Sequence, residues 1–215
     1  MAEDKVKKSH VAIGVFGGCA LIVVIAIIFL YIGISKTGLI GKSDTFPEPT
    51  RVVNVEAGTI DSVKTDLVAS ALRSLKNGEA HVVVTEEMLT SLMRQDLAAA
   101  GEQEGLDLAN AQIAILDGFL EVYVPLEKDG QKTALTMLVK PILENGDIHM
   151  EIEEARLGTL KAPGFITDIP ENLINDGIKK QLDALDGSFE LTTVLLTDGE
   201  MTLGGKISLK NIPGF

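Results

Sequence analysis

The chain has 215 residues and is acidic, with 31 Asp and Glu residues against 19 Lys and Arg residues and a formal net charge of −12. This charge repels nucleic acid, and no cluster of basic residues offsets it, so the sequence excludes nucleic-acid binding. The single cysteine, Cys19, leaves no intrachain disulfide and no thiolate metal site.

The first predicted element is a transmembrane helix at residues 11–34, an apolar run without a charged residue. At the helical rise it extends roughly 36 Å, enough to cross a hydrocarbon core of about 30 Å. The tail at residues 1–10 carries Lys5, Lys7 and Lys8, against Lys36 and Lys42 on the other flank, and this small bias predicts a cytoplasmic N-terminus. We therefore expect a single-pass protein of the cell membrane whose C-terminal domain is extracytoplasmic.

Two alternatives for this run fit the sequence less well. A cleaved signal peptide has a shorter apolar region of about 7–15 residues, followed by a cleavage site of small residues. Residues 16–19, Phe-Gly-Gly-Cys, loosely resemble a lipobox, but the apolar run continues to residue 34 instead of ending at Cys19. The run is therefore expected to stay uncleaved, as a signal-anchor.

Residues 35–50 mix Gly, Ser, Thr and Pro without periodicity and are predicted to be a tether, followed by one domain at residues 51–215. The domain begins with a predicted helix at residues 60–77 and a strand at residues 80–84. Thr85 and the acidic pair Glu86-Glu87 predict the start of a second helix. The predicted buried face of this helix consists of Met88, Leu89, Leu92, Met93 and Leu97.

Apolar residues then alternate from residue 111 to residue 152, with turns at Asp117-Gly118, Asp129-Gly130 and Asn145-Gly146. Asx-Gly between alternating runs is a strong hairpin signal, so this stretch predicts a β-meander, with one strand at residues 133–140. A third amphipathic helix is predicted at residues 166–185, and a final hairpin with its turn at Asp198-Gly199 follows it. The expected fold class is α+β: an N-terminal transmembrane helix followed by a curved antiparallel β-meander packed with amphipathic helices.

The sequence carries no catalytic motif. His10, His81 and His149 are isolated, and the chain lacks zinc-protease, nucleophile-elbow, P-loop and dinucleotide-binding motifs. We therefore predict no enzyme, no catalytic residue, no metal and no cofactor. A hydrolase whose carboxylates the sequence does not single out is the weakest of the alternatives.

The abundance of aliphatic residues is the feature of the domain that is most informative about a ligand. A curved sheet with a long amphipathic helix against it either closes into an ordinary core or encloses an aliphatic groove suited to acyl chains. The candidate ligand contacts lie on the third helix and on the meander: Leu173, Ile178, Leu182, Val122, Leu138 and Ile152.

Two stretches carry a family resemblance: Val84-Thr85-Glu86-Glu87-Met88-Leu89, and the residues from Leu138-Val139-Lys140-Pro141 through Asn145-Gly146 to Pro163. Over about residues 80–210 the chain resembles the YpmS-like family of single-span envelope proteins of Gram-positive bacteria. The resemblance implies an apolar ligand, because that family is similar in plan to tubular lipid-binding proteins. It implies no catalytic residues.

The sequence thus predicts a membrane-anchored, extracytoplasmic, non-enzymatic module that binds or handles lipid. The alternative is a scaffold or assembly subunit of an envelope protein complex, which uses the edge strands of the meander or the acidic surface to bind a partner. The expected partners are the membrane bilayer, lipid acyl chains and envelope proteins.

Overall fold

The computed structural model describes residues 46–55, 74, 79–99, 106–107, 109–128, 130–162, 168, 171–172, 174–176, 178–179 and 189–207. The predicted cytoplasmic tail and the predicted span at residues 11–34 lie outside the described residues.

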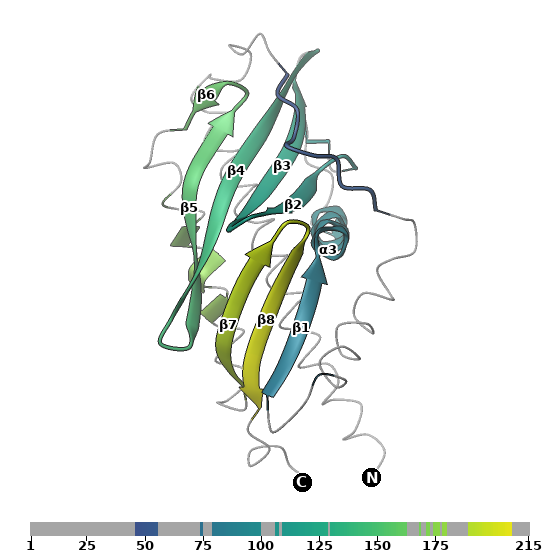
Figure 1. The fold of residues 1–215 in the computed structure, drawn as a ribbon. Helices are drawn as coiled ribbons and strands as arrows, with labels where there is room; N and C mark the ends of the chain where they lie inside the picture. Colours follow the sequence, from purple (N-terminus) through teal and green to yellow (C-terminus); the bar gives the residue numbers. More distant parts are fainter. Residues whose placement is uncertain are drawn as a thin grey trace.

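Five strands form an antiparallel sheet in which each strand pairs with its neighbour in sequence (Figure 1). The strands are β2 (Gln112–Leu116), β3 (Phe119–Lys128), β4 (Gln131–Glu144), β5 (Asp147–Leu157) and β6 (Leu160–Lys161). The turns predicted at Asp117-Gly118 and Asn145-Gly146 are confirmed. The latter has positive φ at both residues, 54° and 87°, which fits the type I′ turn that joins twisted strands.

Strand β4 is longer than the predicted strand at residues 133–140, because it continues through Pro141. The last pair between β3 and β4 is Leu120 with Val139. Beyond it, β4 has a hydrogen-bonded neighbour only in β5. Proline, which lacks a backbone N–H, is tolerated at such an edge position.

Three further strands form a second antiparallel sheet in the order β1-β8-β7. They are β1 (Glu79–Thr85), β7 (Phe189–Thr197) and β8 (Glu200–Ile207). The turn between β7 and β8 is the predicted Asp198-Gly199. Strand β1 pairs with β8 along its whole length, from Glu79 with Lys206 to Thr85 with Glu200.

The expected fold class, with an N-terminal transmembrane helix before a β-meander packed with amphipathic helices, is wrong. The described part of the chain is mostly β, with two antiparallel sheets and few helices. None of the helices in the described part is long and apolar enough to cross a membrane. The physical reason for the second sheet is the long-range pairing of β1 with β8, which local periodicity does not reveal.

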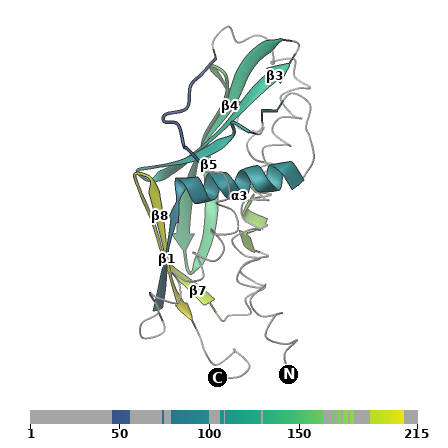
Figure 2. The ribbon, with the colours of Figure 1, turned by 90° about the vertical axis from the view of Figure 1, so that its right-hand side faces the viewer.

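Helix α3 (Glu86–Ala99) follows β1 directly. Its predicted start is confirmed: the Met88 N–H donates to the Thr85 hydroxyl over 3.4 Å, and Glu86 and Glu87 occupy the first turn. Residues 168–179 are helical at every described position, within the predicted third helix. Figure 2 shows α3 and residues 171–179 on the same side of the two sheets.

Residues 46–55 cover the other face of the five-stranded sheet (Figure 2). The backbone N–H of Thr50 donates to the Glu121 carboxylate over 2.8 Å, and the Tyr123 hydroxyl donates to the Pro47 carbonyl over 3.0 Å. The backbone N–H of Val53 donates to the Gln112 side chain over 3.1 Å. This cover explains why β2 and β3 are buried on both faces.

Tyr123 is 4% exposed on the face opposite to Val122. Burial raises the pKa of Tyr123 above its ordinary value, and the nearby Glu48, Asp107 and Glu121 act in the same direction.

The described residues 46–50 belong to the segment predicted as a tether. They lie against the sheet, so this end of the segment is fixed to the domain.

The outward face of the three-stranded sheet has a tight position at Gly204, between His81 of β1 and Thr193 of β7. A Cβ atom there would lie 2.8 Å from His81 Nδ1 and 3.1 Å from Thr193 Cβ. We expect Gly204→Ala to lower the free energy of unfolding by about 1–3 kcal/mol, as overpacking does. Chemical denaturation of the full chain checks this. The double variant Gly204→Ala/His81→Ala should recover part of the loss, and a Gly204→Ala variant of unchanged stability would contradict the packing described.

Candidate functional site

The inward faces of both sheets, α3 and the helical residues 174 and 178 share one buried cluster, which we call the aliphatic interior. All of its members are Ala, Val, Leu, Ile or Met, without one aromatic or polar side chain. They are Val82, Val84, Leu92, Met93, Ala111, Ile113, Ile115, Leu120, Val122, Val124, Leu126, Leu135, Met137, Val139, Ile152, Ala155, Leu157, Ile174, Ile178, Leu196 and Met201.

Three of the predicted ligand contacts lie in this interior. Val122, Ile152 and Ile178 are 2%, 7% and 3% exposed, and they come from the sheet and from the helical segment as predicted. The structure brings them into one cluster, in which the protein's own side chains bury them.

Leu138 lies elsewhere. Its cross-strand partners are Glu121 and Glu154, which places it on the opposite face of the sheet from Val122. Leu173 is outside the described residues, and so is Leu182. The structure therefore does not unite these three residues with the other predicted contacts.

One row of inward side chains in the three-stranded sheet is not fully buried. Val82 of β1, Leu203 of β8 and Val194 of β7 lie side by side across the sheet, and we call them the inner row. Leu203 and Val194 are only half-buried, although Leu203 lies in the middle of the central strand. The flanking inward rows are buried: Val84, Met201 and Leu196 on one side, and Ala80, Gly205 and Leu191 on the other.

The five-stranded sheet has a matching stretch toward the end of the β4–β5 hairpin. Its inward row Val139–Ile152 is buried, but the next pairs, Pro141 with Met150 and Leu143 with Ile148, are half-buried. Figure 1 shows this end of the hairpin beside β7. Half-buried aliphatic side chains thus extend the aliphatic interior on both sheets.

Polar side chains of α3 bond to the backbone of β2, the edge strand of the five-stranded sheet. Glu86, Thr90 and Arg94 are spaced four residues apart and lie along one face of the helix. The Thr90 hydroxyl accepts from the Ile113 N–H over 2.9 Å and donates to the Ile113 carbonyl over 3.1 Å. Glu86 accepts from the Ile115 N–H over 3.1 Å.

Arg94 completes this series, because its Nε donates to the Ala111 carbonyl over 2.7 Å. Burial lowers the pKa of Arg94, against the opposite influence of Asp107. Together the three side chains satisfy edge groups that would otherwise need water or another strand. We call such a set of contacts an edge clamp.

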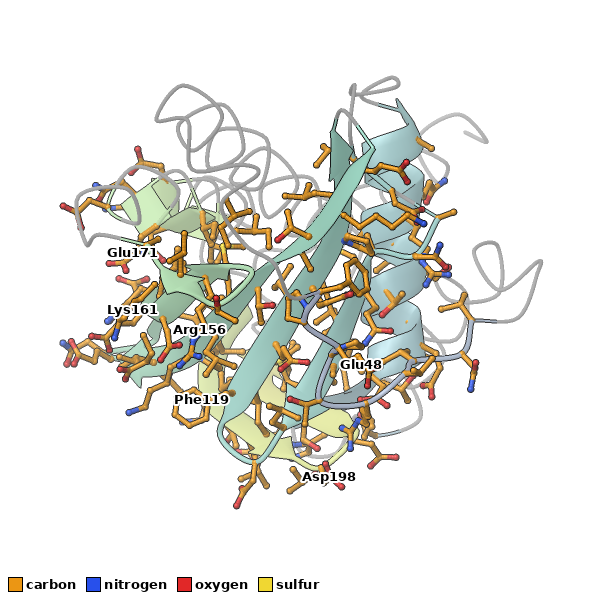
Figure 3. The ribbon with its side chains drawn as sticks, turned by 90° about the horizontal axis from the view of Figure 1, so that it is seen from above. Glu48, Phe119, Arg156, Lys161, Glu171 and Asp198 are labelled. Carbon is orange, nitrogen blue, oxygen red and sulfur yellow. The ribbon has the colours of Figure 1, made fainter. Side chains whose placement is uncertain are left out.

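A second edge clamp closes β5. Asn175 accepts from the Met150 N–H over 2.6 Å and donates to the Met150 carbonyl over 3.0 Å. Glu171, one helical turn earlier, accepts from the Ile152 N–H over 2.9 Å. Figure 3 shows Glu171 and α3 at opposite edges of the five-stranded sheet.

A third edge clamp closes β1, the edge strand of the other sheet. The Ser74 hydroxyl accepts from the His81 N–H over 2.8 Å and donates to the His81 carbonyl over 2.6 Å. Ser74 is helical, as the predicted helix at residues 60–77 requires. The three clamps share one geometry, in which one helical side chain binds both backbone groups of one edge residue.

Arg51 connects the two sheets where the clamp of α3 begins. Its guanidinium bonds to Glu86, with an N–O distance of 2.7 Å, to Asp198 and to the Ile115 carbonyl. Burial disfavours its charge, but the hydrogen bonds to Asp198 and Glu86 outweigh burial and raise the pKa of Arg51. The Gly199 N–H also donates to the Ile115 carbonyl, over 2.8 Å. The β7–β8 turn is thereby attached to β2, and Figure 3 shows Asp198 at this turn.

Glu86, Thr90 and Arg94 bond to backbone, and Arg51 also bonds to Glu86, whereas the buried Ser91 hydroxyl of α3 has no hydrogen-bond partner. Within the described ranges no group of three or more His, Asp or Glu side chains is arranged to hold a metal ion. The arrangement that the described residues offer a ligand is therefore apolar contact. Sequence reasoning missed the clamp residues, although the spacing of Glu86, Thr90 and Arg94 on a helix otherwise lined with Leu and Met was a usable signal.

Comparison with protein-family models gave no match for the chain, and comparison with curated proteins gave none either. The resemblance to the YpmS-like family stays a prediction.

The clamp of α3 is testable at Thr90, which is fully buried. Thr90→Val keeps the shape of the side chain but leaves the Ile113 N–H and carbonyl without partners. Because an unpaired buried polar group costs about 1–3 kcal/mol, we expect a loss of about 2–4 kcal/mol in the free energy of unfolding. Thr90→Ser keeps the hydroxyl and is the matched control, and equal losses in the two variants would argue against the clamp.

Proposed function

We propose that the protein is a membrane-anchored, extracytoplasmic, non-enzymatic module that binds the acyl chain of a lipid in its aliphatic interior. The observation that carries the proposal is the half-exposure of Leu203 and Val194 in the inner row, between two buried rows. Protein interiors are close-packed, with few voids between side chains. Aliphatic side chains left accessible there are suited to an apolar ligand.

The composition of the interior supports an acyl chain over other apolar ligands. Its members carry no aromatic ring, and neither do the partly buried residues packed against it: Met88, Leu89, Leu106, Ile148, Met150, Ala162, Val194 and Leu203. Such a lining offers area and dispersion contacts, which are the contacts that a flexible hydrocarbon chain can make.

The location is proposed from the sequence alone. The apolar run at residues 11–34 is long enough to hold the domain at a bilayer, where lipid is the abundant apolar ligand. The domain's acidic surface repels anionic headgroups, so lipid contact through the interior is more favourable than electrostatic adhesion.

The scaffold hypothesis loses one of its supports. It relied in part on free edge strands, but β2, β5 and β1 each have helical side chains bonded to their edge groups. A partner strand would have to displace these clamps before it could pair. The lipid proposal requires no such displacement.

The proposal is tested by reconstituting the full chain in phosphatidylcholine vesicles that contain a phosphatidylcholine with a diazirine on its acyl chain. After irradiation, mass spectrometry maps the labelled peptides. We expect label on residues 148–150 and 194–203. Label on residues 11–34 is expected from the anchor in any case, so it serves as the positive control.

A matched pair of variants separates binding from nonspecific contact. Val194→Thr adds a hydroxyl in the inner row and should lower the label on residues 194–203 by about fivefold, the equivalent of about 1 kcal/mol. Val83→Thr, on the outward face of the same sheet and 38% exposed, should leave it unchanged. Label confined to residues 11–34 in the unmodified protein would contradict the proposal.

A further inference from the structure

The boundaries of the two sheets differ in how they are closed. In the described part of the chain, clamps from helical residues close the edges of β2, β5 and β1. Edges without a clamp in the described part are that of β7, the part of β4 beyond Val139 and the outer edge of the two-residue strand β6. Figure 1 shows the first two of these edges side by side, and we call the line between them the seam.

No hydrogen bond or ion pair crosses the seam between residues 140–150 and the described residues of β7. The contact near its end is van der Waals: a Cβ atom at Gly146 would lie 3.7 Å from Glu190 Cγ and 3.9 Å from the Leu191 carbonyl oxygen. Separating the two strands there breaks no polar contact between described residues, whereas opening any clamp breaks at least two hydrogen bonds.

The side chains that face inward at the seam are apolar and half-buried on both strands. Leu143 of β4 lies on the same face as Ile148, and Val194 of β7 lies in the inner row. A hydrocarbon chain that passes between the strands would therefore meet Leu143 or Val194 first and Leu203 next, without burying a charge.

We propose that the acyl chain enters and leaves the aliphatic interior through the seam between β4 and β7, by movement of the β4–β5 hairpin away from β7. This inference rests on the proposed function. The clamped edges then stay closed, and the ligand enters and leaves at the seam. The rate of lipid entry should therefore depend on how freely the end of the β4–β5 hairpin moves.

The test bridges the seam chemically in the full chain. A Cys19→Ser protein with Asp147→Cys and Glu190→Cys is joined by a short bismaleimide that contains a reducible disulfide. Asp147 follows the hairpin turn and Glu190 begins the described side chains of β7, and both are exposed. The matched control is Asp147→Cys with Glu144→Cys, which joins two paired, exposed residues of the hairpin and leaves the seam free.

Each protein is reconstituted in phosphatidylcholine vesicles, the diazirine phosphatidylcholine is added from donor vesicles, and samples are irradiated over time. We expect the bridge across the seam to slow labelling of residues 194–203 by about tenfold or more, as blocking a gating motion does, and reduction to restore it. The control bridge should leave the rate unchanged.

The outcomes are distinguishable. Unchanged labelling of residues 194–203 in the protein bridged across the seam would overturn the entry route and leave the proposed function standing. Absence of label on these residues in the unbridged protein would overturn the proposed function, and the entry route with it.

Discussion

Backbone N–H and C=O groups at the edges of a sheet must find partners, and this requirement sets the position of the helices in this protein. Thr90, Asn175 and Ser74 each bind both backbone groups of one edge residue, in β2, β5 and β1 respectively. Edge strands are thereby closed without a further strand.

The clamps also determine which helical side chains form the interior. When polar side chains of a helix bond to a strand edge, residues close to them in the helix face the sheet. Met93, three residues after Thr90, and Ile174, directly before Asn175, are buried in this way. The aliphatic interior is thus a consequence of the clamps. At the seam the inward side chains Leu143 and Val194 are half-buried, and so is the side chain of the clamped residue Met150.

Local elements of this fold could be predicted from sequence, and long-range ones could not. The Asn145-Gly146 turn and the start of α3 after Thr85 depend on neighbouring residues, so their chemistry is readable in the chain. The pairing of β1 with β8 joins segments more than a hundred residues apart, and no periodicity encodes it. Of the predicted ligand contacts, Val122, Ile152 and Ile178 lie in the buried cluster. Leu138 lies on the opposite face of the sheet, because alternation alone does not fix which face of its strand meets the core.

Amide hydrogen exchange of the full chain tests the clamps most directly. The amides of His81, Ile113, Ile115, Met150 and Ile152 donate to side chains and to no neighbouring strand. The account predicts that these five exchange slowly, as amides inside the sheets do, while the β7 amides that face the seam exchange fast. Fast exchange at the five clamped amides, or equal protection at the seam, would contradict it.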